Sequence, residues 1–100
     1  MMDPLNVLKS LLGEFFKYNL YADAIVLLRR AVKDNPYYQH NWENVKQLIA
    51  DRDLEPRLPL QLMDVSANLP LDENSDEEAY RWLQLMVKNV ENENNEIVVY

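Results

Sequence analysis

Apolar residues recur every three or four positions along most of the chain, which is the pattern of helices that bury one face. The first such stripe follows Asp3 and Pro4, a capping carboxylate and a residue that favours the first helical position. Asn19 is expected to end this helix near residue 18, because asparagine tolerates the left-handed conformation better than most residues. The predicted buried positions are Leu5, Leu8, Leu11, Leu12, Phe15 and Phe16.

Two more stripes predict a second helix over residues 21–33 and a third over residues 37–51, with Pro36 between them. The second helix is expected to bury Ala24, Ile25, Leu28, Ala31 and Val32. The third is expected to bury Tyr38, Trp42, Val45, Leu48 and Ile49.

Pro56 and Pro59 forbid a continuous helix, so residues 52–59 are predicted to be an irregular connection. A short fourth helix is expected from Pro59 to about residue 68, with Leu60, Leu62, Met63 and Val65 as its apolar residues. Ser75, with Glu78 three residues later, forms a capping-box pattern that predicts a fifth helix to about residue 90. This helix is expected to bury Ala79, Leu83, Met86 and Val90, with Trp82 on its flank.

The pattern as a whole predicts an all-α fold, a single compact bundle of about five helices in one domain over residues 1–100. Residues 91–100 change character, because a polar stretch is followed by the apolar Ile97, Val98, Val99 and Tyr100. The sequence leaves open whether these residues form a flexible tail, a short extended segment or strand, or a strip docked on the domain or on a second copy.

The spacing of four residues in the second predicted helix resembles the second half of a tetratricopeptide repeat: Ala24, Leu28, Ala31 and Pro36. A shift of roughly 34 residues places Trp42, Val45 and Ile49 where Leu8, Leu11 and Phe15 stand in the first unit. The resemblance implies two tetratricopeptide-like hairpins over about residues 5–70, capped by the last helix. The sequence departs from the repeat at Leu12, Lys46 and Leu58, and two ordinary helical hairpins fit the same pattern.

Negative charge is concentrated in the second half of the chain. The formal net charge is −7; residues 1–50 carry six basic and five acidic side chains, and residues 51–100 carry four basic and twelve acidic ones. Such a field repels nucleic acid and anionic membranes and speeds encounter with basic proteins. We therefore expect neither direct nucleic-acid binding nor membrane binding, although acidity that serves only solubility is an equal explanation.

Residues that usually carry catalysis or bind cofactors are scarce. The chain has no cysteine, one glycine and one histidine, His40, which excludes thiolate chemistry, glycine-rich phosphate loops and histidine-based metal sites. Asp51, Asp53 and Glu55 alternate like the start of a calcium loop, but Pro56 stands where that loop needs glycine. We predict a protein that is not an enzyme and has no catalytic residue, cofactor or metal. The absence of cysteine and of a signal peptide favours a cytoplasmic location.

Residues 24–38 and 76–83 resemble helical immunity proteins of bacterial contact-dependent growth inhibition. The resemblance implies a protein that neutralises a cognate basic toxin domain, a nuclease acting on RNA, tRNA or DNA, by blocking its active site or substrate groove with an acidic surface. Candidate contact residues cluster around the last predicted helix, where acids and an aromatic residue alternate: Asp72, Glu73, Asp76, Glu77, Tyr80 and Glu91.

Two other functions fit parts of the sequence. A small helical, tetratricopeptide-like adaptor would dock a peptide in a hairpin groove beside aromatic residues such as Tyr38. An enzyme that uses paired carboxylates is the other alternative, although no pair of acids is placed for that work. The sequence does not decide whether two copies associate into a homodimer.

Overall fold

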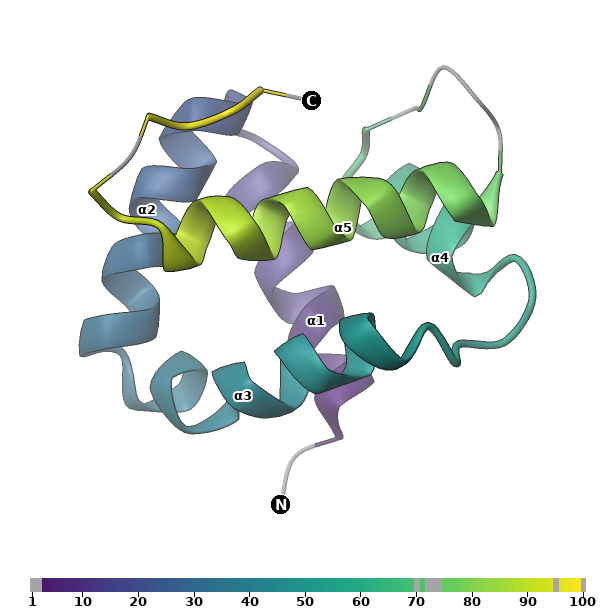
Figure 1. The fold of residues 1–100 in the computed structure, drawn as a ribbon, viewed down its shortest axis with the longest axis horizontal. Coiled ribbons are helices and arrows are strands. Elements are labelled where there is room, and N and C mark those ends of the chain that lie inside the picture. Colours follow the sequence, from purple (N-terminus) through teal and green to yellow (C-terminus); the bar gives the residue numbers. More distant parts are fainter. Residues whose placement is uncertain (1–2, 70, 72–74, 95, 100) are drawn as a thin grey trace.

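The computed structural model describes residues 3–69, 71, 75–94 and 96–99, and its described part contains five continuous helices and no strand. The all-α class and the number of helices are therefore confirmed. The five helices and their order along the chain can be followed in Figure 1. None of the described helices is long and apolar enough to cross a membrane.

The first helix begins where the sequence predicted. It comprises α1 (Pro4–Leu11) and a continuation with π-helical hydrogen bonding, η1 (Leu12–Phe16). The Asp3 carboxylate accepts a hydrogen bond of 3.0 Å from the Leu5 N–H and so caps the helix. Asn19 contributes to the end of the helix in a different way from the one predicted: its side-chain amide donates to the Phe15 carbonyl at 2.9 Å, and its backbone is not left-handed.

The next two helices are α2 (Tyr21–Asp34) and α3 (Pro36–Asp51). Only Asn35 separates them, and its side chain accepts a hydrogen bond of 3.0 Å from the Tyr37 N–H, which caps α3. Because Pro36 occupies the first position of α3, the missing proline N–H costs that helix no hydrogen bond. The chain therefore turns sharply from α2 into α3.

The fourth helix is short and consists of α4 (Leu58–Gln61) and the π-helical η2 (Leu62–Ser66). Its predicted apolar face is correct at Leu62 and Met63 but wrong at Val65, which is 70% exposed. The fifth helix, α5 (Asp76–Glu91), is capped by the Ser75 hydroxyl, which accepts from the Glu78 N–H at 3.2 Å. Trp82 was expected on the flank of this helix, and it is instead 3% exposed in the core.

A single core joins all five helices. It is formed by side chains such as Leu8, Phe16, Leu28, Ile49 and Leu83, each almost completely buried. Three aromatic rings meet edge to face or at a tilt in and beside this core, with 5.0 Å between the ring centres of Phe16 and Trp82 and 5.7 Å between those of Tyr21 and Trp82. The core therefore ties the N-terminal helices directly to α5.

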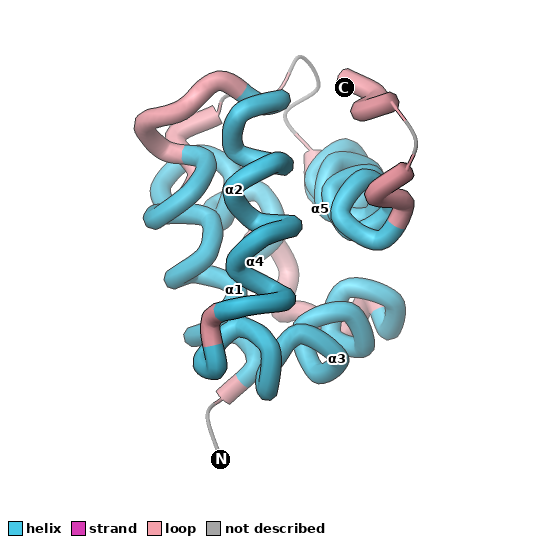
Figure 2. Tube along the Cα trace, turned by 90° about the vertical axis from the view of Figure 1, so that its left-hand side faces the viewer, coloured by secondary structure: helices cyan, strands magenta, loops and turns pink. Residues whose placement is uncertain are grey.

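The second predicted tetratricopeptide-like hairpin is wrong. α3 packs against α1 and α2, but it makes at most marginal contact with α4, which packs against α5. The connection between α3 and α4 contains Arg52 and Arg57, both in the left-handed region, with φ of 51° and 71°. These two bends, with Pro56 between them, direct the chain away from α3 instead of back along it. α5 crosses α2 and closes the core, as Figure 2 shows by viewing it nearly end-on beside α2.

The described part of the C-terminal segment is docked on the domain. Residues 96–99 are extended, and they lie across the N-terminal half of α2 in Figure 1. The Asn89 side chain holds them, because its amide donates to the Val98 carbonyl and accepts from the Val98 N–H, both at 2.9 Å. Of the alternatives that the sequence left open, the short extended segment and docking on the domain are both observed for residues 96–99.

Candidate protein-binding surfaces

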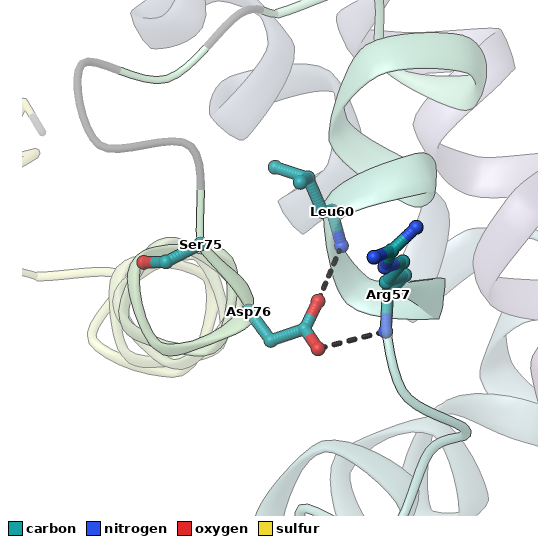
Figure 3. Close-up of a pocket in the computed structure, with 4 residues that line it drawn as sticks. All are labelled: Arg57, Leu60, Ser75 and Asp76. Atoms are coloured by element: carbon teal, nitrogen blue, oxygen red, sulfur yellow. Dashed lines mark hydrogen bonds between the residues drawn. The ribbon is translucent and has the colours of Figure 1, made fainter.

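Asp76, at the first position of α5, is half-buried and points toward the start of α4. Its carboxylate accepts hydrogen bonds from the N–H of Arg57 at 2.8 Å and from the N–H of Leu60 at 3.3 Å. Figure 3 shows the carboxylate aimed at these two backbone groups, while the Ser75 side chain points elsewhere. Asp76 therefore anchors the start of α4 to the start of α5.

Glu77 and Tyr80 hold the same connection. Glu77 forms an ion pair with Arg52 and a longer one of 3.8 Å with Arg81. The Arg52 guanidinium lies over the Tyr80 ring, 4.9 Å from its centre. The Tyr80 hydroxyl accepts a hydrogen bond of 3.1 Å from the Leu54 N–H, and the side chain is only 6% exposed. Tyr80 is therefore part of the packed interior in this structure.

Glu91 lies at the opposite end of α5, about 22 Å from Asp76 at 1.5 Å per residue. It forms an ion pair with Lys46, which also pairs with Glu43 at 2.8 Å. The hydrogen bonds to Glu43 and Glu91 raise the pKa of Lys46 above its ordinary value. Asp72 and Glu73, the other two predicted contact residues, lie outside the described residues.

The four predicted contact residues that the structure describes do not gather into a single acidic patch. The structure brings Asp76, Glu77 and Tyr80 together, but it occupies them with partners inside the molecule. Their role as partner contacts stays a prediction. The sequence could not have shown these internal partners, because Arg52, Leu54, Arg57 and Leu60 lie 16 to 26 residues away along the chain.

Other carboxylates at the same end of the molecule are presented to solvent. Asp53 and Glu55, in the connection between α3 and α4, and Asp64, on η2, are all exposed. Within the described part of the chain none of the three makes an ion pair or a hydrogen bond through its carboxylate. Figure 1 places this connection and α4 at the end of the molecule where α5 begins. We call Asp53, Glu55 and Asp64 the acidic end.

Two residues of the acidic end, Asp53 and Glu55, belong to the alternating acids of residues 51–55, which in the sequence resemble only the start of a calcium loop. Among the described residues, no three acidic or histidine side chains gather closely enough to hold a metal ion. The Asp51 carboxylate accepts a hydrogen bond of 2.6 Å from the Gln47 side chain. The surface thus offers separate carboxylates instead of a chelating cluster.

A second surface feature is a groove bordered by η1, α2 and the start of α3, which we call the α2 groove. Its volume is about 520 Å³. The apolar lining includes Phe15, Leu27 and Pro36, and the charged lining comprises Glu14, Arg30 and Asp34. A groove of this volume lies within the range of about 300–1,000 Å³ that is usual for ligand-binding clefts.

Tyr38 lies behind this groove and orients Glu14. Its hydroxyl donates a hydrogen bond to Oε2 of Glu14 and lies 3.1 Å from the Ser10 hydroxyl. The pKa of Tyr38 is raised to about 12, mainly by burial and secondly by the hydrogen bond to Glu14. The hydroxyl therefore keeps its proton at neutral pH. The Tyr38 side chain is only 2% exposed, so it is not itself an exposed aromatic residue of a peptide-binding groove.

Comparisons of this chain with known protein families, with curated proteins and with solved structures found no match. The resemblance to immunity proteins stays a prediction.

Proposed function

We propose that this protein is an inhibitor that binds a basic protein, of the kind represented by the immunity proteins of contact-dependent growth inhibition. The cognate partner would be a toxin domain with nuclease activity. Nucleases need positive charge to hold phosphates, so an acidic inhibitor can cover their substrate groove with complementary charge.

The observation that supports this proposal is the acidic end. Its three carboxylates are exposed and carry no intramolecular ion pair among the described residues, whereas Glu77, Glu91 and Glu93 are paired with Arg52, Lys46 and Lys33. A carboxylate without an internal cation contributes more negative potential at the surface than one that is already paired, so it attracts a basic partner more strongly. The acidic end therefore presents negative charge that a basic partner can neutralise.

The inhibitor would act by electrostatic steering followed by steric blockade. Opposite fields raise the association rate, and this effect weakens as salt screens the charges over about 8–10 Å at physiological ionic strength. Once docked, the rigid helical body prevents nucleic acid from entering the same groove. No chemical step is required of the protein.

The first test uses the C-terminal domain of the protein encoded by the gene next to that of this chain. We expect this domain to stop growth when it is produced alone in a bacterial host, and growth to resume when this protein is produced with it. A neighbouring domain that is harmless, or toxicity that persists in the presence of this protein, would contradict the proposal.

The second test measures the role of the acidic end with the combined variant Asp53→Asn, Glu55→Gln and Asp64→Asn. In stopped-flow binding to the same toxin domain at low salt, we expect the association rate to fall about tenfold, because steering depends on these charges. The matched control, Asp23→Asn with Glu43→Gln and Glu96→Gln, changes the net charge equally but at exposed positions elsewhere. Equal losses in the two variants would show that only the total charge matters and not the acidic end.

A further inference from the structure

We infer that the α2 groove holds an arginine or lysine side chain of the basic partner. This inference depends on the proposed function only for the identity of that partner. The groove combines an apolar floor, an oriented carboxylate and a second carboxylate, which together match a cationic head on a long aliphatic stem.

The floor suits the aliphatic stem. Phe15, which is 8% exposed, and Leu27, which is 39% exposed, both line the groove. Arginine and lysine bury their methylene groups along such apolar surfaces while their charged ends stay near polar groups. A long side chain bound in the groove would cover the part of Leu27 that the rest of the described fold leaves exposed.

Glu14 is prepared to receive the cationic head. One of its oxygens, Oε2, is held by the Tyr38 hydroxyl, while Oε1 has no hydrogen bond within the part of the chain that the structure describes. A carboxylate whose orientation is already set loses less entropy on binding than a freely rotating one. The open oxygen is therefore a ready acceptor for a guanidinium or ammonium group.

Asp34 supplies the second negative charge in a place that helix energetics disfavour. It is the last residue of α2, where the negative end of the helix dipole repels an acid. Asp34 is exposed and makes no ion pair within the described residues. A local conflict that no internal contact relieves is typical of a binding position, and a bound cation would relieve it.

Arg30 is the opposing charge in the lining. Its side chain also borders a neighbouring hollow that contains Val26, Lys33 and Glu93, so it lies on the ridge between two depressions. The two carboxylates outnumber it, and the net charge of the lining is negative. The groove therefore favours a cation over an anion or a neutral side chain.

The experiment is a titration of the isotope-labelled protein with N-acetyl-arginine amide, followed by NMR. The comparison ligand is N-acetyl-citrulline amide, which has nearly the same shape but no charge. We expect arginine to shift the amide signals of residues 14–16 and 27–37 in a saturable way, and citrulline to bind at least about threefold more weakly. Equal binding of the two ligands would show an apolar groove without charge selectivity, as an adaptor would use, and would overturn the inference.

The variants Glu14→Gln and Asp34→Asn test the two carboxylates. Glutamine can still accept the Tyr38 hydrogen bond through its amide oxygen, and loss of the acid at the end of α2 does not harm the helix, so both variants should fold. We expect each to weaken arginine binding about threefold. Asp23→Asn, on the same helix but outside the groove, is the control and should bind as the unaltered protein does. Shifts that map outside the groove, or an affinity for arginine that is unchanged in both groove variants, would overturn the inference.

The two proposals can fail separately. If arginine binds in the α2 groove but this protein does not restore growth in the presence of the neighbouring toxin domain, the groove is still a cation site. The inhibitor function is then refuted. If this protein rescues growth from the toxin but Glu14→Gln and Asp34→Asn bind arginine as tightly as the unaltered protein does, the cation site in the groove is refuted. The inhibitor function then still stands.

Discussion

Asn89 on α5 is only 3% exposed, and its side chain binds both α2 and the C-terminal segment. Its amide nitrogen donates to the Tyr21 hydroxyl at 2.8 Å and to the Val98 carbonyl, while its oxygen accepts from the Val98 N–H. Its own backbone carbonyl accepts two hydrogen bonds from Arg29, at 2.9 and 2.7 Å. The side chain thus takes the place that a neighbouring strand would have beside residue 98.

We predict that Asn89→Ala releases the C-terminal segment. The Val98 backbone would lose both partners and return to water, and the Tyr21 hydroxyl would lose its donor, so the free energy of unfolding should fall by about 2 kcal/mol. Urea denaturation measures this loss, and hydrogen exchange at the Val98 amide reports the release directly. Asn44→Ala, on the exposed face of α3, is the control and should change stability little. A Val98 amide that stays protected in Asn89→Ala would contradict the prediction.

At the scale of elements, the first two turns of α5 hold the connection between α3 and α4. Asp76 binds the backbone where α4 begins, Glu77 pairs with Arg52, and Tyr80 binds the backbone at Leu54. The connection contains two left-handed residues that are not glycine, a conformation that costs each of them roughly 1–2 kcal/mol. The contacts from α5 offset this cost.

We expect Asp76→Ala to lower the free energy of unfolding by about 1–2 kcal/mol, because the exposed N–H of Arg57 and the half-buried N–H of Leu60 lose a charged acceptor. Asp23→Ala is the matched control, since Asp23 also lies in the first turn of a helix but binds no distant backbone among the described residues. The difference between the two variants in chemical denaturation isolates the loop contacts from the helix dipole. Equal losses would show that Asp76 acts only through the dipole.

At the scale of the whole molecule, one core contains both tryptophans. Trp42 on α3 is 4% exposed and Trp82 on α5 is 3% exposed. Both belong to the same cluster of buried side chains, which draws on every helix. A domain of this size with a continuous core is expected to unfold in one cooperative transition.

We predict that the single-tryptophan variants Trp42→Phe and Trp82→Phe each show one unfolding midpoint, the same by fluorescence of the remaining tryptophan and by circular dichroism. Each variant should be less stable than the unaltered protein, because phenylalanine leaves part of the indole volume empty. Fluorescence and circular dichroism midpoints that differ within one variant would show that α3 and α5 unfold separately.

The helices themselves could be predicted from the sequence, because their signals are local. Asp3, Asn35 and Ser75 each accept a hydrogen bond from a backbone N–H two or three residues ahead, so the start of α1, α3 and α5 depends on a few neighbouring residues. The three- and four-residue spacing of apolar positions likewise needs no knowledge of the fold. Local geometry thus determined the class of the protein and most of its helix boundaries.

The partners of the charged side chains were decided only by the tertiary structure. Asp76, Glu77 and Glu91 looked alike in the sequence as exposed acids on one helix, yet the fold brings Arg57, Arg52 and Lys46 to them from 19 to 45 residues away. Trp82 and Tyr80 entered the core for the same reason, since α5 is covered on several sides by helices whose positions depend on the whole chain. Helical periodicity is a property of a segment, whereas the pairing of a charge depends on which segments meet.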